Sequence, residues 1–452
     1  MFRVCVLLAL GAPWQAPGQS PGQPGSAAQG EPSAEGPEHY WPQWRGPLGT
    51  GVAPHADPPL EWSEEKNVRW KVGLPGTGLS TPVVFGERVF VTSAVPIGDP
   101  VEPMPETAPG AHDNVLVAQR HEYVALAFAR ADGELLWRRS LKTELPHEGG
   151  HYTGSYASQS PAADREHLFA YFGSRGLFCL DHDGAVFWEA DLGDMQTKHG
   201  HGEGSSPVLH GDTLVVNWDH EGQSFLVALD KKTGEERWKV PRDEATSWAT
   251  PIVVDVDGAA QVVVSGTPRL RGYDLATGEV IWECGGLAHN IVASPVAADG
   301  MVFAGSSYEK QALLAIRLAG ARGDLAATEH VAWYRRKMTP YVPSPLLYDG
   351  ALYFLNHYQG PLSRVIARTG EQPQRPMRLD GLDDVYASPV GAAGRIYLVD
   401  RSGLAVVLSH EDQPRVLARN SLHDGFSASP ALAGGELYLR GERFLYCLAA
   451  QE

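Results

Sequence analysis

The chain has 452 residues, a formal net charge of −17 and 43% hydrophobic residues. So negative a charge argues against sequence-independent binding to nucleic acid and against docking on anionic lipid. Its 50 glycines and 34 prolines, with short runs of Val, Tyr, Trp and Thr, favour many short strands over a helical fold.

Residues 1–28 are typical of an export signal. Arg3 precedes an apolar stretch, Val4 to Ala12, that is too short to cross a bilayer, and Ser26-Ala27-Ala28 offers small residues for cleavage. A cut nearer Ala12 and an unstructured start without a signal are the alternatives. We therefore expect an exported chain, periplasmic or secreted, with no transmembrane segment.

Removal of Cys5 with the signal leaves three cysteines, Cys179, Cys284 and Cys447. Cys179 and Cys447 stand inside apolar runs, and an odd number cannot all pair with one another. Free buried thiols are therefore expected, rather than a disulfide framework or a metal site.

Residues 29–60 divide into two parts. The first is rich in Pro, Gly, Gln, Ser and Ala, which predicts a flexible lead-in. The second begins at Tyr40 and contains Trp41 and Trp44, so it is too aromatic for a linker and is expected to pack on the outside of the main domain. From Glu61 to Glu452 no domain boundary is predicted.

Residues 224–251 show the unit that repeats along this domain. Phe225 to Leu229 is predicted as a strand, Thr233-Gly234 as a tight turn, and Glu236 to Val240 as a second strand carrying Trp238. Thr250-Pro251 then opens the next unit. Proline is tolerated there because its missing N–H can face away from the strand ladder.

Ser-Pro or Thr-Pro pairs open eight such units. After a first interval of about 79 residues they follow at intervals of about 41 to 50, close to the four-strand period of a propeller blade. The long first interval contains an insertion, Pro96 to Arg120. The prolines of the eight pairs are Pro82, Pro161, Pro207, Pro251, Pro295, Pro345, Pro389 and Pro430.

The outermost strand of each wedge-shaped blade needs bulky side chains to fill the space beside its neighbour. Tryptophan occupies this place in five units, whereas the sixth and seventh have Met377 and Leu417 nearby, so their packing is expected to be less regular. The five are Trp137, Trp188, Trp238, Trp282 and Trp333.

The eighth unit ends after a strand from Phe444 to Ala449 and has no Trp strand of its own. Val68 to Val72, which carries Trp70, precedes the first opener at the spacing of an outermost strand. We therefore expect an all-β, eight-bladed β-propeller of four-stranded antiparallel blades, closed by the N-terminal strand pairing in the last blade.

The segments from Ala228 to Trp238 and from Tyr273 to Trp282 resemble the tryptophan-docking repeat of pyrroloquinoline-quinone (PQQ)-like propellers. That superfamily includes quinoprotein alcohol dehydrogenases and the propeller subunit of the outer-membrane β-barrel assembly machinery. From Trp41 onward, the chain is similar to exported bacterial PQQ-like repeat proteins. The resemblance is specific for the fold and weakly specific for function.

Strand order in an antiparallel meander decides which loops share one end of the ring. Loops between the second and third strands, and between blades, are expected at one end, and this set contains the long, His-rich segments. Long loops gathered at one end of a rigid scaffold usually mark its binding face. Ten histidines are placed there: His112, His121, His147, His151, His199, His201, His220, His289, His357 and His423.

Aromatic residues stand three or four positions before several openers and are expected to ring the axial mouth, where flat ligands can stack on them. The alternative is that they plug the channel and meet no ligand. The predicted ligand-binding set is Trp248, Tyr341, Tyr386 and Phe426, with Asn290, His151 and His423.

One constellation has the residue types of a metal site, because imidazole and carboxylate suit zinc or a similar cation. It comprises His199, His201, Glu203, Asp219 and His220. Its spacing matches no defined motif, and a hydrogen-bonded loop network is the alternative. Asn217 and Asp383-Asp384 are candidates for calcium ligands or for solvated turns.

The leading functional hypothesis is an exported binding or scaffold propeller that recognises a protein partner or small ligand on its loop-rich face, as a monomer. The sequence has no nucleophile elbow, phosphate loop or catalytic triad spacing. It also lacks the vicinal cysteines of the quinoprotein dehydrogenases. The alternative is a PQQ-dependent oxidoreductase holding the quinone and a divalent metal such as calcium.

Overall fold

The computed structural model describes residues 36–358 and 360–451, so the expected export signal and the start of the lead-in lie outside the described residues. The described residues belong to one compact unit whose regular structure is almost entirely β. It begins with a short 3-10 helix, η1 (Pro37–His39).

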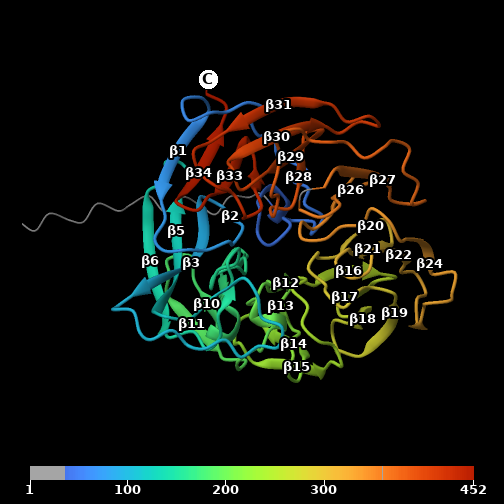
Figure 1. Cartoon of the computed structure of the whole chain (residues 1–452), viewed down its shortest axis with the longest axis horizontal. Coiled ribbons are helices and arrows are strands. Elements are labelled where there is room, and N and C mark those ends of the chain that lie inside the picture. The colour runs from blue at the N-terminus through green and yellow to red at the C-terminus, as the bar shows by residue number, and fades with distance from the viewer. Residues whose placement is uncertain (1–35, 359, 452) are drawn as a thin grey trace, which may run out of the picture. The chain divides into compact units, whose positions relative to one another are not determined.

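Eight sheets follow one another around a central axis, in chain order from blue to red in Figure 1. Blade 1 contains β2 (Val83–Phe85), β3 (Arg88–Ile97), β5 (Arg120–Ala129) and β6 (Leu135–Glu144). Blade 2 contains β8 (Ala162–Ala163), β9 (Leu168–Tyr171), β10 (Leu177–Leu180) and β11 (Val186–Ala190). Blade 3 contains β12 (Val208–His210), β13 (Thr213–Trp218), β14 (Phe225–Asp230) and β15 (Glu236–Pro241). Blade 4 contains β16 (Ile252–Val256), β17 (Ala259–Ser265), β18 (Arg269–Asp274) and β19 (Val280–Gly285), with β23 (Gly323–Asp324) added at its edge.

Blade 5 contains β20 (Val296–Ala298), β21 (Met301–Ser306), β22 (Ala312–Arg317) and β24 (Val331–Arg335). Blade 6 contains β25 (Leu346–Tyr348), β26 (Ala351–Leu355) and β27 (Leu362–Ile366). Blade 7 contains β28 (Val390–Ala392), β29 (Arg395–Val399), β30 (Leu404–Ser409) and β31 (Val416–Ser421). Blade 8 contains β32 (Ala431–Ala433), β33 (Glu436–Arg440), β34 (Phe444–Ala449) and β1 (Val68–Gly73). Outside the blades lie the pair β4 (Asn114–Val115) and β7 (Gly150–His151), and the 3-10 helices η2 (Gly173–Arg175) and η3 (Lys198–Gly200).

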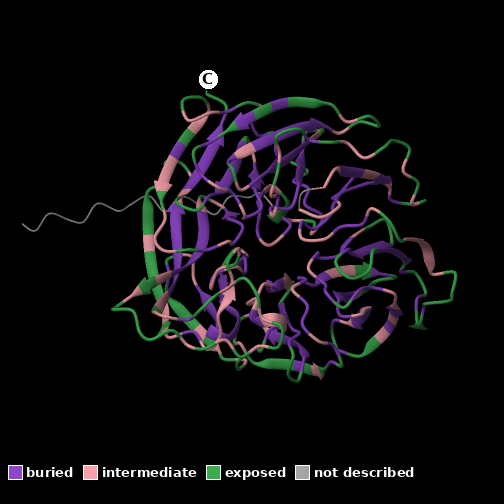
Figure 2. Cartoon of the chain, viewed as in Figure 1, coloured by how far each residue is buried: buried purple, intermediate pink, exposed green. Residues whose placement is uncertain are grey.

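The middle strands are buried on both faces because each blade packs against two neighbours. Every residue of β13 and β21 is buried, whereas the outermost β15 exposes most of its residues. Figure 2 shows this change from buried inner strands to exposed outer ones. The apolar runs in the sequence are therefore inner strands covered on both sides.

The predicted ring closure is confirmed. β1 pairs antiparallel with β34, with Trp70 opposite Cys447. The innermost strands of neighbouring blades also contact each other all the way round, including β2 of the first blade and β32 of the last. Closure leaves no open sheet edge at the junction of the two chain ends.

The tryptophans fill the gaps between blades, as predicted, by docking on the glycine turn of the next blade. The Trp188 indole N–H donates to the Lys231 carbonyl at 3.0 Å, and a Cβ on Gly234 would lie 2.7 Å from that ring. Gly234 also has a φ of +73°, so glycine suits the turn on both grounds. The same contact joins Trp70, Trp137, Trp238 and Trp333 to the turns at Gly133, Gly184, Gly278 and Gly370.

Trp282 differs because blade 5 has no tight Thr-Gly turn to receive it. Its indole N–H donates to Gln261 Oε1 at 2.9 Å, inside its own blade. β23 pairs in parallel with β19 beside it. Blade 6 is irregular, as expected, with Met377 bridging Leu362 in place of a fourth strand. Blade 7 is a complete four-stranded sheet, but Leu417 on its outermost strand is 39% exposed where other blades dock a tryptophan.

A ring of hydroxyl groups links the openers from blade to blade. The backbone N–H of Ser206, for example, donates to Thr250 Oγ1 at 2.9 Å. Six more bonds of this kind run from Thr81 to Ser160, Ser160 to Ser206, Thr250 to Ser294, Ser294 to Ser344, Ser344 to Ser388 and Ser388 to Ser429. Ser or Thr before the proline therefore also links one blade to the next by a hydrogen bond.

The aromatic segment after η1, expected to pack outside the main domain, is part of its core. Trp41 is fully buried and bridges Val84 of blade 1, while Val52 bridges Gly391 of blade 7. Trp44 reaches the ring of hydroxyls, where its indole N–H donates to Ser294 Oγ at 3.3 Å.

Candidate functional site

A cavity of about 810 Å³ occupies the axial mouth at the end of the ring that carries the long loops. Apart from Trp44 and His121, its lining comes from the connections between second and third strands and from those between blades. Among the described residues, none of the short Thr-Gly and Asp-Gly turns contributes. A volume of this size suits a small ligand or an inserted side chain.

The floor of the cavity combines Trp44 with the hydroxyl ring. Trp44 also lines a second cavity of about 420 Å³ towards the other end of the ring, so it borders both cavities. Sequence reasoning missed this role because Trp44 lies far from every opener along the chain. Its only signal was its place in the aromatic segment that was expected to pack on the outside of the main domain.

One side of the cavity, the Tyr wall, consists of Tyr308, Tyr341, His357, Tyr358 and Tyr386. The rings follow one another with centroid separations of 5.7 Å from Tyr308 to Tyr341 and 4.9 Å from Tyr341 to His357. The Tyr358 and Tyr386 rings stack at 5.3 Å. Burial raises the pKa of Tyr341 to about 12, so its phenol is neutral. The wall offers flat, uncharged rings to the cavity.

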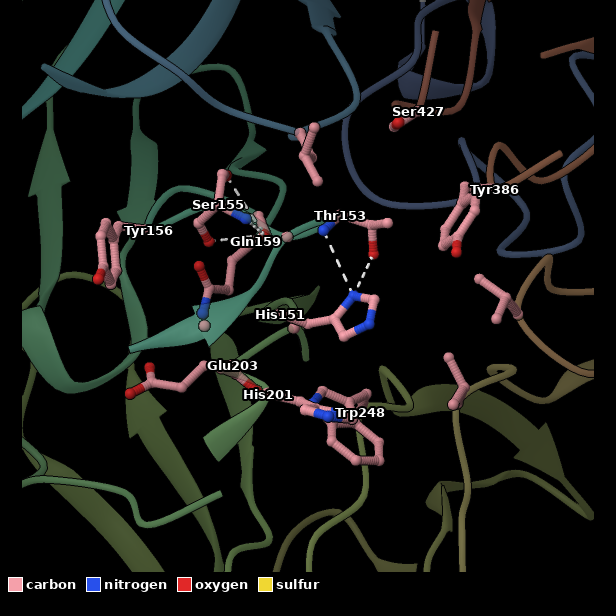
Figure 3. Close-up of a pocket in the computed structure, with 18 of the residues that line it drawn as sticks. His151, Thr153, Ser155, Tyr156, Gln159, His201, Glu203, Trp248, Tyr386 and Ser427 are labelled. Atoms are coloured by element: carbon pink, nitrogen blue, oxygen red, sulfur yellow. Dashed lines mark hydrogen bonds between the residues drawn. The ribbon is translucent and has the colours of Figure 1, made fainter. Parts of the chain in front are cut away.

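The other side, the His wall, consists of His112, His151, His199 and His201. The His201 ring lies 4.7 Å from that of His112, 4.8 Å from that of His151 and 5.3 Å from that of His199. Burial, reinforced by the neighbouring imidazoles, lowers the pKa of His201 to about 4. His201 is therefore neutral at physiological pH. In Figure 3, His151, His201 and Trp248 lie across the cavity from Tyr386.

Half-buried carboxylates support the loops of the His wall. Glu203 accepts hydrogen bonds from the Ser174 N–H, at 2.8 Å, and from the Ser174 hydroxyl. Glu148 accepts from the N–H and hydroxyl of Thr197, next to η3. Burial raises the pKa of both carboxyl groups above the ordinary value. These bonds fix the loops from which the histidines project.

Five of the seven predicted ligand-binding residues line the cavity: Trp248, Asn290, Tyr341, Tyr386 and His151. The Trp248 indole N–H donates to the Gly202 carbonyl at 2.7 Å and so braces the His wall. Phe426 is only 1% exposed and packs on Tyr446 instead. The His423 N–H donates to Glu64 at 2.8 Å, away from the cavity. Tyr308, Tyr358 and His112 line the cavity but were not in the predicted set.

The five predicted metal ligands do not surround one point. His199 and His201 belong to the His wall, whereas Glu203 is bonded to Ser174 beneath it. Asp219 forms a fully buried ion pair with Arg242 at 2.7 Å, and His220 Nδ1 accepts from the Gln196 N–H at 3.1 Å. Because these groups are already satisfied, Asp219 and His220 form the hydrogen-bonded network that was the alternative.

The suggested calcium ligands make hydrogen bonds and an ion pair of their own. Asn217 Nδ2 lies 3.3 Å from Asp219 Oδ2 and 3.2 Å from Ser247 Oγ. Asp384 pairs with Arg401 at 3.0 Å, and the Asp383 N–H donates to Asp400. Asp383 and Asp384 therefore belong to a structural network, whereas Asn217 Oδ1, the atom that could ligate a cation, is buried without a hydrogen-bond partner.

The cavity does not fit pyrroloquinoline quinone, which carries three carboxyl groups. Arg175 is the one Lys or Arg among the described lining residues, and it is already bonded to Glu144 and His147. Asp113, Glu148 and Glu203 add carboxyl groups to the lining. Cys179, Cys284 and Cys447 are free thiols buried elsewhere. None of these lining residues offers an unpaired positive charge to neutralise a ligand with three negative charges.

Comparisons with known proteins agree with this architecture. A family model described as outer membrane protein assembly factor BamB matches residues 120–374 and 223–451. None of the curated proteins compared with the chain matches it. No helix in the described residues is long and apolar enough to cross a membrane.

Several solved structures share the fold. BamB from Moraxella catarrhalis is 15% identical with a TM-score of 0.53, over 79% of this chain and 98% of that one. A europium-containing methanol dehydrogenase is 11% identical with a TM-score of 0.50, over 91% and 98%. The quinohemoprotein alcohol dehydrogenase ADHIIG from Pseudomonas putida HK5 is 10% identical with a TM-score of 0.56, over 92% and 81%. At these identities the similarity concerns the fold alone. With the family model matching most of its length, the chain belongs to the BamB family of PQQ-like β-propellers.

Proposed function

We propose that this chain is an exported binding propeller whose axial cavity receives a flat, uncharged or cationic group, carried by a small ligand or by a partner protein. The observation that carries the proposal is the Tyr wall, a row of stacked rings in a cavity of about 810 Å³. Rings arranged in this way favour stacking with a flat group.

The charges of the lining support the choice of ligand. The lining contains three carboxyl groups, on Asp113, Glu148 and Glu203. Its one guanidinium, on Arg175, is already bonded to Glu144. An anion entering the cavity would lose its hydration without gaining a free cation, whereas an amine or amide would gain acceptors.

A protein partner fits the same end of the ring. Apolar side chains are exposed beside the cavity, including Val115 at 58%, Tyr152 at 60% and Tyr308 at 54%. Exposed apolar groups around a cavity are typical of a docking surface. The assembly-factor name of the matching family and the expected export signal favour a partner outside the cytoplasm.

The test measures the binding of matched flat aromatic amines, amides and carboxylates to the full chain by ligand-detected NMR. The amines and amides should bind and the carboxylates should not. Tyr341→Ala should weaken binding at least about tenfold by removing a stacking face. Phe187→Ala, on the exposed outer strand β11, is the matched control. Equal effects of the two substitutions, or a preference for the carboxylates, would contradict the proposal.

The oxidoreductase alternative is tested separately. The protein is incubated with the quinone and Ca²⁺ and then offered alcohols and sugars with an artificial electron acceptor. We expect no turnover, because the lining residues do not match the charge of the quinone. Turnover that disappears in His199→Ala would replace the binding proposal with the oxidoreductase.

A further inference from the structure

Three histidines from two distant segments have their rings packed together at the edge of the cavity. His112 comes from the insertion in blade 1, and His199 and His201 from the loop between blades 2 and 3. Their ring centroids are separated by 5.2 Å, 4.7 Å and 5.3 Å. Imidazoles that ligate one tetrahedral ion have ring centres about 5 Å apart, given metal–nitrogen bonds of about 2.0–2.1 Å.

Each of the three rings has one nitrogen directed at a backbone group. His112 Nδ1 lies 2.9 Å from the Gly110 carbonyl, and His199 Nδ1 lies 3.1 Å from the Pro109 carbonyl. A carbonyl only accepts, so both nitrogens carry the proton and both Nε2 atoms keep a free lone pair. His201 is hydrogen-bonded to the His112 backbone, and its Nε2 is buried without a partner. Histidine ligands of metals are held in this way.

The two segments are joined by further bonds that hold the rings together. The Asn114 side chain donates to the His199 carbonyl at 2.8 Å and to Glu106 at 2.7 Å. Gly110, with a φ of +72°, allows the close approach, because a Cβ there would lie 2.9 Å from His199 Nδ1. His199 itself has a φ of +59°, in the left-handed region that is sparsely populated by residues other than glycine.

We propose that His112, His199 and His201 bind one divalent transition-metal ion of the Zn²⁺ class, with His151 or water in the fourth position. Imidazole nitrogens suit such ions and are poor ligands for Ca²⁺ and Mg²⁺. The His151 ring is 4.8 Å from that of His201. Bound metal would fasten the insertion to the loop between blades 2 and 3. The site does not depend on the proposed ligand of the cavity.

A second group of metal-ligating residues provides a comparison within the chain. Within residues 36–358 and 360–451, one group has its ligand atoms within 4.8 Å of one another: Glu38, His39 and His55. The ligand atoms of the His wall lie farther apart, so its rings must turn before they can converge on one ion. The His39 and His55 rings are stacked at 4.2 Å and lie on the surface. Substitutions in one group or the other show which of the two binds the ion.

The experiment titrates the EDTA-treated full chain with ZnCl₂ in a calorimeter, with CaCl₂ as the comparison ion. We expect one Zn²⁺ per chain and no Ca²⁺ at this site. His112→Ala, His199→Ala and His201→Ala should each weaken Zn²⁺ binding at least about tenfold. His357→Ala, in the Tyr wall of the same cavity, and His55→Ala should leave the affinity unchanged.

Hydrogen exchange gives a second measurement that needs no cavity ligand. Zn²⁺ should slow exchange in residues 109–114 and 198–202 together, and this joint protection should be lost in His112→Ala. His112 is exposed, so its substitution leaves the fold intact. Zn²⁺ binding that is lost in His55→Ala and kept in His112→Ala would overturn the proposal, as would the absence of saturable Zn²⁺ binding.

Discussion

The two walls of the axial cavity occupy equivalent loop positions in the propeller but are held in place by different forces. The His wall is fixed by hydrogen bonds, from Ser174 to Glu203, from Thr197 to Glu148 and from Asn114 to His199. The Tyr wall is built from stacked rings, and its phenol groups make few bonds, such as the 3.5 Å contact of Asn290 with Tyr341. Stacked rings tolerate small changes, whereas a buried polar network does not.

Because of this difference, the two walls suit different kinds of ligand. The Tyr wall offers apolar faces and no strongly directed group, which suits a ligand recognised by shape. The His wall offers imidazole lone pairs on loops that are joined by hydrogen bonds, which suits a cation. One set of loops on a repeated scaffold therefore carries two kinds of recognition, and the following substitutions test whether the two walls are energetically distinct.

The largest effect is expected for Glu203→Ala. It leaves the Ser174 N–H and hydroxyl without their acceptor in a buried place, which should lower the free energy of unfolding by about 3 kcal/mol. Tyr358→Ala in the Tyr wall removes a stacked ring and should cost only about 1 kcal/mol. Urea unfolding of both variants measures the contrast, and equal costs would remove the distinction between the walls.

Trp248→Phe should have an intermediate effect. Phenylalanine keeps most of the packing but loses the bond from the indole N–H to the Gly202 carbonyl, at a cost of about 1 kcal/mol. Hydrogen exchange should become faster in residues 199–204 and remain unchanged in residues 356–358. Faster exchange in both segments would show that Trp248 supports the whole mouth and not one wall.

Protonation of His201 at acid pH should lower the free energy of unfolding of the metal-free protein by no more than about 1 kcal/mol. The effect is small because His201 is partly exposed and its charge is screened by solvent. The pKa of His201 is about 4 in the folded chain, against an ordinary value of 6.5. Between these values the unfolded chain binds the proton and the folded chain does not, so stability falls as the pH falls from 6.5 to 4. The difference in unfolding free energy between wild type and His201→Gln, followed over this range, isolates the effect. A difference that does not change with pH would contradict it.

The smallest effect is expected for Tyr341→Phe. The substitution keeps the ring that stacks on Tyr308 and His357 and removes only a hydroxyl with a long contact to Asn290. Unfolding free energy should change by less than about 0.5 kcal/mol, and binding of a flat ligand should persist. A loss as large as that of Tyr341→Ala would mean that the Tyr wall also depends on directed hydrogen bonds.

The sequence was sufficient to predict the number of blades, the glycine turns and the ring closure by β1. Each of these depends on a pattern repeated within one unit, such as the Thr233-Gly234 turn followed by Trp238, or on the missing outer strand of the last unit. It also identified the loops that line the cavity, because strand order alone decides at which end of the ring a loop emerges.

Only the tertiary structure decided which side chains from those loops meet. It placed Trp44 on the floor of the cavity, joined His112 to His199 and His201, and paired Asp219 with Arg242 away from them. It also buried Phe426, which stands four residues before its proline, as Tyr341 does before its own. Ring closure brings distant segments to one axis, and the direction of each side chain there follows from packing against other blades, which no spacing along the chain records.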